Sequence, residues 1–163
     1  MEIDYSNVTE VPGNRITREQ LARMFQRYSF AAKFCEGKDV LEVACGAGQG
    51  LGYLRSKARQ LVGGDCTAKL VRSAKDYYKD RIGILQLDAQ YLPFKDNAFD
   101  VVILYEAIYY LPQADRFLRE CRRLLRDEGV LLICTVNKDW LEFNPSPHST
   151  KSVSYTHLQA HET

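Results

Sequence analysis

The chain has 163 residues, a formal net charge of +1 and 45% apolar residues. This length suits one domain rather than two, and the apolar content is sufficient for a hydrophobic core. Its charges are interspersed, so the sequence predicts neither a nucleic-acid-binding stripe nor an acidic disordered tail. No apolar run approaches the roughly 20 residues that cross a bilayer, and the first residues lack the layout of a signal peptide.

The cysteine pattern is typical of a reducing compartment. The chain has five cysteines, an odd number, and none are paired at C-x-x-C spacing. A disulfide framework or a metal site is therefore not expected. Small buried thiols are the simpler interpretation, and the sequence predicts a cytoplasmic protein.

In chain order, the first predicted element is a helix over residues 16–35, where Thr17 and Gln20 have the spacing of a capping box. An apolar strand follows at 38–45, and a glycine-rich turn then leads into a second helix at 51–58. The first helix has an apolar face formed by Leu21, Met24, Phe25, Tyr28 and Ala32.

Strands and helices alternate over the rest of the chain. Further strands are predicted at 59–65, 82–88, 99–107 and 128–136, and further helices at 67–80, with Thr67 as the N-cap, and at 113–127. Continuous apolar strands separated by helices are typical of a parallel sheet covered on both faces. With right-handed crossovers, the expected fold is α/β: a doubly wound, Rossmann-like sheet of about five parallel strands.

The turn in "VLEVACGAGQGLG" (residues 40–52) follows the first strand. Ligands of such sheets bind at the carboxyl ends of the strands, where Gly46, Gly48 and Gly50 let the backbone approach a ligand closely. The next helix N-terminus offers free N–H groups. Two cofactor classes use this arrangement. The dinucleotide fingerprint G-x-G-x-x-G fails here, because Leu51 occupies its sixth position.

Acidic residues add a second signal at the strand ends. Asp65 ends one strand and can accept hydrogen bonds from both hydroxyls of a ribose, in either cofactor class. Asp88, followed by Ala89, suits an adenine, whose amine can donate to the carboxylate while the next backbone N–H donates to the ring. With Glu42 nearby, the field would repel a pyrophosphate and tolerate a cationic sulfonium. Capping of a helix N-terminus is the alternative role for Asp65 and Asp88.

Five stretches in this order resemble the motifs of class I S-adenosylmethionine-dependent methyltransferases, near the type 11 group. They are "VLEVACGAGQG", "LVGGD", "LQLDAQYLPF", "FDVVILYEAIYYL" and "LLRDEGVLLICTVN", and the resemblance covers roughly residues 15–150. It implies S-adenosylmethionine as the cofactor and a set of site residues. The implied contacts are Glu42, Ala44, Gly46 and Gly48 with the methionine part; Asp65, with Cys66 beside it, with the ribose; Asp88 and Ala89 with the adenine; and Tyr105 and Glu106 facing the methyl group.

Methyl transfer needs orientation more than dedicated catalytic groups, and it needs a general base only if the nucleophile must lose a proton. Glu106 and His148 are the candidate bases, and Glu106 is the better placed. Tyr28 and Arg15 are candidates to close over the cofactor. We expect an unidentified small-molecule acceptor, with no nucleic acid and no membrane. The alternatives are an NAD(P)-dependent Rossmann oxidoreductase and a non-catalytic cofactor-binding module.

The end of the chain departs from the family pattern. Members continue past the fifth strand with a helix and a β-hairpin, for which this chain has no room. Residues 153–163 resemble the translation of a transposase sequencing adapter, differing only at Gln159. We therefore expect an incomplete methyltransferase domain at 1–152, a non-native tail at 153–163, and a fifth strand left at the edge of the sheet.

Overall fold

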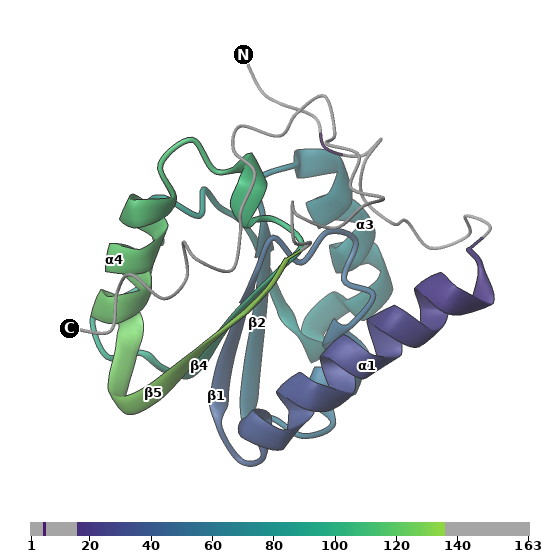
Figure 1. The fold of residues 1–163 in the computed structure, drawn as a ribbon, viewed down its shortest axis with the longest axis horizontal. Helices are drawn as coiled ribbons and strands as arrows, with labels where there is room; N and C mark the ends of the chain where they lie inside the picture. The colour runs from purple at the N-terminus through teal and green to yellow at the C-terminus, as the bar shows by residue number, and fades with distance from the viewer. Residues whose placement is uncertain (1–4, 6–15, 136–163) are drawn as a thin grey trace.

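A computed structural model describes Tyr5 and residues 16–135. Its centre is a sheet of five parallel strands in the order β3-β2-β1-β4-β5 (Figure 1). The strands are β1 (Asp39–Val43), β2 (Gln60–Asp65), β3 (Gly83–Gln86), β4 (Phe99–Tyr105) and β5 (Leu125–Cys134). The predicted doubly wound, Rossmann-like sheet is confirmed, and within residues 16–135 β5 forms one edge of it.

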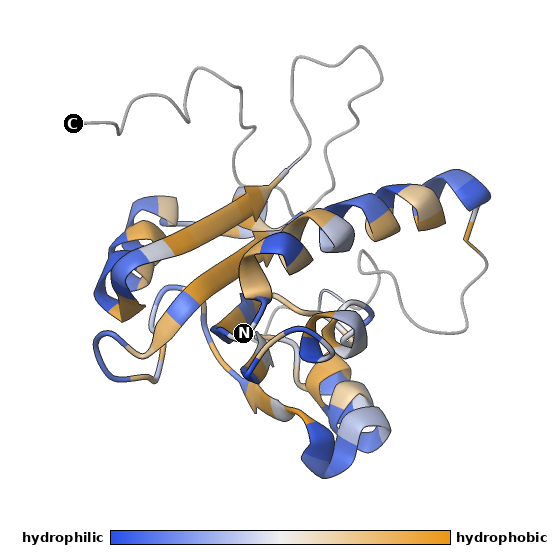
Figure 2. Cartoon of the chain, turned by 90° about the horizontal axis from the view of Figure 1, so that it is seen from below, coloured by the Kyte–Doolittle hydropathy of each residue, from blue (hydrophilic) through white to orange (hydrophobic). Residues whose placement is uncertain are grey.

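Helices cover both faces of the sheet. They are α1 (Arg18–Cys35), α2 (Leu51–Arg55), α3 (Ala68–Tyr78) and α4 (Ala114–Leu124), with short 3₁₀ turns η1 (Lys79–Arg81) and η2 (Ile108–Tyr110). Buried side chains of α1, α2 and α3 pack on one face, and those of α4 pack on the other. The strands between them are strongly hydrophobic (Figure 2), as two-sided burial requires. Among the described residues, no helix is long and apolar enough to span a membrane.

The first helix begins with the predicted capping box. The Thr17 side chain accepts from the backbone N–H of Gln20, and the Gln20 side chain accepts from that of Thr17. The predicted apolar face is only partly buried, because the first turns of α1 extend beyond the sheet (Figure 2). Leu21 and Phe25 are 50% and 63% exposed, whereas Ala32 is buried. Helical spacing predicts which residues of α1 form the apolar face. It does not predict which of them the sheet covers.

Several element ends differ from the prediction. The helix predicted over 113–127 ends at Leu124, and β5 begins at Leu125. Leu125 fits an apolar helix face, but it adopts extended geometry and pairs with Phe99. Residues 44, 45, 87 and 88 lie in loops past their strands. Thr67 is the N-cap of α3 by position, although its hydroxyl makes no capping hydrogen bond. His148, Arg15 and the predicted tail at 153–163 lie outside the described residues.

Candidate functional site

A cavity of about 610 Å³ opens at the carboxyl ends of the strands. Its walls come from α1, the turn after β1, the end of β2, and the loops after β3 and β4. Residues far apart in sequence therefore meet here, as expected for an open parallel sheet. The predicted site residues that line it are Glu42, Ala44, Gly46, Asp65, Cys66, Asp88, Ala89, Tyr105 and Glu106.

Gly48 is also described by the structure, but unlike the other residues predicted to contact the cofactor it does not line the cavity. It has φ +85°, and a Cβ built on it would lie 2.8 Å from the ring of Tyr78. The Tyr78 hydroxyl donates to the carbonyl oxygen of Gly48 at 2.6 Å and accepts from the N–H of Gly52 at 3.0 Å. The absence of a side chain at Gly48 thus allows Tyr78 of α3 to pack against the turn and to hydrogen-bond to it. Sequence periodicity places Tyr78 on the buried face of its helix but gives no sign of this contact.

Asp65 ties the turn to β2. Its Oδ2 accepts from the N–H of Gly46 at 2.9 Å, and its Oδ1 accepts from the N–H of Thr67 at 2.8 Å. Burial raises the pKa of Asp65, and these two backbone donors oppose the rise. The Thr67 side chain also hydrogen-bonds to this carboxylate. Because a carboxylate has about four acceptor positions, about one remains for a donor in the cavity. The proposed ribose contact and the alternative structural role are therefore compatible.

Asp88 and Ala89 lie in the loop after β3. Asp88 is exposed, and its Oδ1 accepts from the backbone N–H of Gln90 at 2.8 Å and from the Gln90 side chain at 3.3 Å. The Gln90 side chain in turn accepts from the N–H of Gln113, which connects the loop to the start of α4. Ala89 is buried beside the cavity. The pair keeps its predicted place at the third strand, in a turn and not in the strand.

Glu42 is a buried carboxylic acid, and only one of its two oxygens has a hydrogen-bond partner. Its side chain is 2% exposed; Oε1 accepts from the Tyr28 hydroxyl at 2.6 Å, and Oε2 is buried without a hydrogen-bond partner. Burial raises the pKa of Glu42 to about 7. Tyr28 reaches it by crossing Gly50, where a Cβ would lie 1.9 Å from the tyrosine ring. Gly50 therefore serves this close approach of α1.

Glu106 is held by a residue that the sequence analysis missed. Its backbone has φ +51°, and its Oε1 accepts from Arg27 Nη1 at 2.9 Å. Its Oε2 and the Nε of Arg27 are buried without a partner. Tyr105 donates from its hydroxyl to the backbone oxygen of Arg27 at 3.1 Å and packs edge-on against Tyr28. No spacing in the sequence pairs position 27 with position 106.

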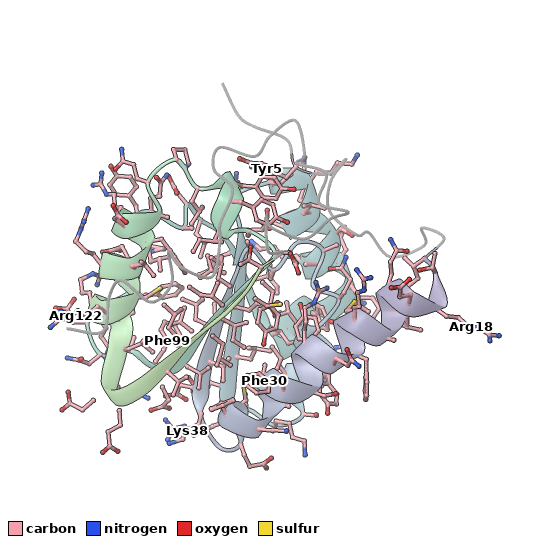
Figure 3. The ribbon with its side chains drawn as sticks, in the orientation of Figure 1. Tyr5, Arg18, Phe30, Lys38, Phe99 and Arg122 are labelled. Carbon is pink, nitrogen blue, oxygen red and sulfur yellow. The ribbon has the colours of Figure 1, made fainter. Side chains whose placement is uncertain are left out.

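Aromatic rings form the rest of the cavity wall. The rings of Tyr109 and Tyr110 lie 4.5 Å apart between centroids, and that of Tyr5 lies 5.2 Å from Tyr110. Figure 3 shows Tyr5 above the ends of the strands, where its N–H donates to the Thr67 hydroxyl. Burial raises the pKa of Tyr109, so this ring stays neutral at physiological pH. This wall suits a flat or apolar ligand.

The sequence and the fold match known proteins. Residues 41–133, more than half of the chain, match a family described as a methyltransferase domain. A Mycobacterium tuberculosis protein named "Probable S-adenosylmethionine-dependent methyltransferase" is 35% identical over 118 residues, covering 72% of this chain and 42% of that protein. The ubiquinone biosynthesis O-methyltransferase of Rhodopseudomonas palustris is 26% identical over 130 residues, covering 77% of this chain and 51% of the relative.

Among solved structures, the YcgJ protein from Bacillus subtilis has a TM-score of 0.74 at 21% identity, covering 83% of this chain and 65% of YcgJ. This likeness concerns the fold. The chain spans about half, or less, of the length of the two curated relatives above. The matched family, the five-stranded parallel sheet and the ordered motifs agree, and the chain belongs to the class I S-adenosylmethionine-dependent methyltransferases, in the type 11 methyltransferase domain family.

Proposed function

We propose that this cavity binds S-adenosylmethionine and directs its methyl group to a small-molecule acceptor. The observation that carries the proposal is that Glu42 lines the cavity beside the glycine turn and that its Oε2 is a buried acceptor without a partner. A buried acceptor needs a donor, and the ammonium group of the cofactor supplies one. The remaining acceptor position of Asp65 suits the ribose, and the exposed Asp88 suits the adenine.

The cofactor brings an electrophilic methyl group on a sulfonium, and the residues of this chain bind, orient and exclude water. Glu42, Ala44 and Gly46 hold the methionine part, Asp65 and Cys66 border the ribose, and Asp88 and Ala89 hold the adenine. Gly48 acts through the turn that it shapes. The Tyr105 ring faces the methyl group, where a cation–π contact favours a sulfonium.

Glu106 is the proposed residue that meets the acceptor. Because Arg27 occupies Oε1, a hydrogen bond or a proton from the acceptor goes to Oε2. An acceptor with a hydroxyl group or an amine fits that position. The cavity, of about 610 Å³, has the size of small-molecule sites, which supports a small acceptor over a macromolecule.

All five cysteines are free, which supports a cytoplasmic location.

Calorimetric titration with S-adenosylhomocysteine, with NADH as the comparison ligand, tests the proposal. We expect S-adenosylhomocysteine alone to bind, and Asp65→Ala to abolish that binding. Asp76→Ala, which removes an exposed carboxylate on α3, is the matched control. Binding of NADH alone would support the oxidoreductase alternative, which no comparison favours. Methyl transfer to a panel of hydroxylated and aminated acceptors then separates an enzyme from a cofactor-binding module.

A further inference from the structure

Two consecutive residues of α1 reach two carboxylates at neighbouring strand ends. Arg27 binds Glu106 after β4, and Tyr28 binds Glu42 in β1. The Tyr28 contact is the more buried, because Glu42 is 2% exposed. Tyr28 occupies Oε1 only, whereas Oε2 is buried without a partner, in a residue that lines the cavity. The helix therefore fixes one oxygen of this carboxylate and leaves the other for a ligand.

Among the described residues, the surroundings of Glu42 hold little positive charge. The cation there that acts on it is Arg27, whose Nη1 already pairs with Glu106. The other titratable groups that interact with it are Tyr28 and Cys35 from α1, Cys45 from the turn, Asp65 from β2, Tyr78 from α3 and Tyr105 from β4. These are neutral hydroxyls and thiols and one further carboxylate. Burial therefore dominates, and it raises the pKa of Glu42 to about 7.

We propose that Tyr28 is a positioning residue that holds Glu42 so that Oε2 meets the cofactor's ammonium group, and that cofactor binding expels a proton from Glu42. This inference rests on the proposed function. The protonated carboxyl and the ammonium-bearing ligand give an ion pair and one proton, which passes to the buffer. Affinity is then fully present above the pKa of free Glu42 and falls as the pH drops below it. The limiting slope is about tenfold per pH unit for one proton.

The Tyr28 hydroxyl stabilises the ionised carboxylate by donating to it. Tyr28→Phe removes this donor and keeps the ring that packs over Gly50. The midpoint of the pH dependence should move upward, and more protons should be released for each ligand bound at pH 7. A merely structural role would weaken binding equally at every pH and leave the proton count unchanged.

The test is calorimetry of S-adenosylhomocysteine binding between pH 5.5 and 7.5, in pairs of buffers with different ionisation enthalpies. The difference within each pair gives the number of protons released. At pH 7 we expect about half a proton for the natural chain, because free Glu42 is then about half protonated. We expect more for Tyr28→Phe and none for Glu42→Gln. Tyr77→Phe, which alters a tyrosine that is 68% exposed, should match the natural chain.

Ligand binding without proton release, or the same release in Glu42→Gln, would overturn this inference and leave the proposed cofactor in place. An unchanged proton count in Tyr28→Phe would overturn the role of Tyr28. Absence of binding by the folded natural chain would overturn the proposed function together with the inference. Far-UV circular dichroism of each variant shows whether the fold is retained.

Discussion

The ring of Tyr78 occupies the space that a side chain at Gly48 would need, and the Tyr78 hydroxyl donates to the Gly48 carbonyl oxygen at 2.6 Å. Tyr78 of α3 thereby fixes the position of the turn that borders the cavity. The same hydroxyl accepts from the N–H of Gly52, so one side chain ties together the turn at Gly48 and the first turn of α2. Gly46 and Gln49, on either side of Gly48, line the cavity, so its shape depends on this packing.

Gly48→Ala should lower the free energy of unfolding by about 2–5 kcal/mol. The left-handed backbone at φ +85° costs an alanine about 1–2 kcal/mol, and the 2.8 Å contact with the Tyr78 ring adds an overpacking cost of about 1–3 kcal/mol. Urea denaturation measures the loss. Titration with S-adenosylhomocysteine should also show weaker binding, because the turn must shift.

Gly37→Ala is the matched control, since Gly37 has φ +68° and nothing within 4 Å of a built Cβ. It should cost only the backbone strain of about 1–2 kcal/mol and leave ligand binding unchanged. Equal losses of stability in the two variants would show that the Tyr78 ring yields without cost.

Arg27 and Glu106 should show strong energetic coupling. Arg27→Met leaves Glu106 Oε1 with only the weak thiol donor of Cys134 at 3.9 Å, while Oε2 already has no partner. Both side chains are partly exposed, at 21% and 29%, so we expect a loss of about 1–3 kcal/mol, below that of a fully buried pair. Removing the charge as well, in Arg27→Met/Glu106→Gln, should recover at least about 1 kcal/mol of it.

The double-mutant cycle from urea denaturation gives this coupling directly. Arg23→Met is the control, because Arg23 lies one turn earlier on α1 and its Glu19 partner is exposed. That variant should change stability by less than about 0.5 kcal/mol. Additivity of Arg27→Met and Glu106→Gln would contradict the importance of the pair.

The sequence predicts the positions at strand ends well, because alternation of apolar strands and helices fixes which ends meet. Glu42, Asp65 and Glu106 gather at one cavity for that reason. Contacts between side chains that are distant in sequence cannot be predicted from local residue spacing. Arg27 and Tyr78 were accordingly missed, although both lie on helices that were predicted. Nothing in the glycine pattern separates Gly46, which borders the cavity, from Gly48, which packs against α3.

Competing local signals explain the boundary errors. Leu124 and Leu125 both fit an apolar helix face, but pairing of Leu125 with Phe99 draws the chain into β5. Leu21 and Phe25 fit the face of α1 equally well and lie largely exposed, because burial depends on where the sheet ends. Tertiary contacts therefore determine where a helix ends and which residues of its apolar face are buried.

Cys66 should react slowly for an exposed thiol and should be protected by the cofactor. It is exposed beside the cavity, and burial of the sulfur together with the Asp65 carboxylate raises its pKa to about 11. At pH 8 its thiolate is roughly two hundred times scarcer than that of an ordinary cysteine. The greater nucleophilicity of a high-pKa thiolate recovers part of this, which leaves alkylation about 10- to 20-fold slower than for a free thiol.

Mass spectrometry after timed treatment with iodoacetamide measures this rate at Cys66, with free cysteine as the reference. The rate should rise about tenfold for each pH unit between 8 and 10, since the thiolate fraction does. Asp65→Asn removes a neighbouring carboxylate and should accelerate the reaction. Saturation with S-adenosylhomocysteine should slow the reaction further, because the proposed ribose position lies next to the sulfur. Equal rates with and without the ligand would place the ribose away from Cys66.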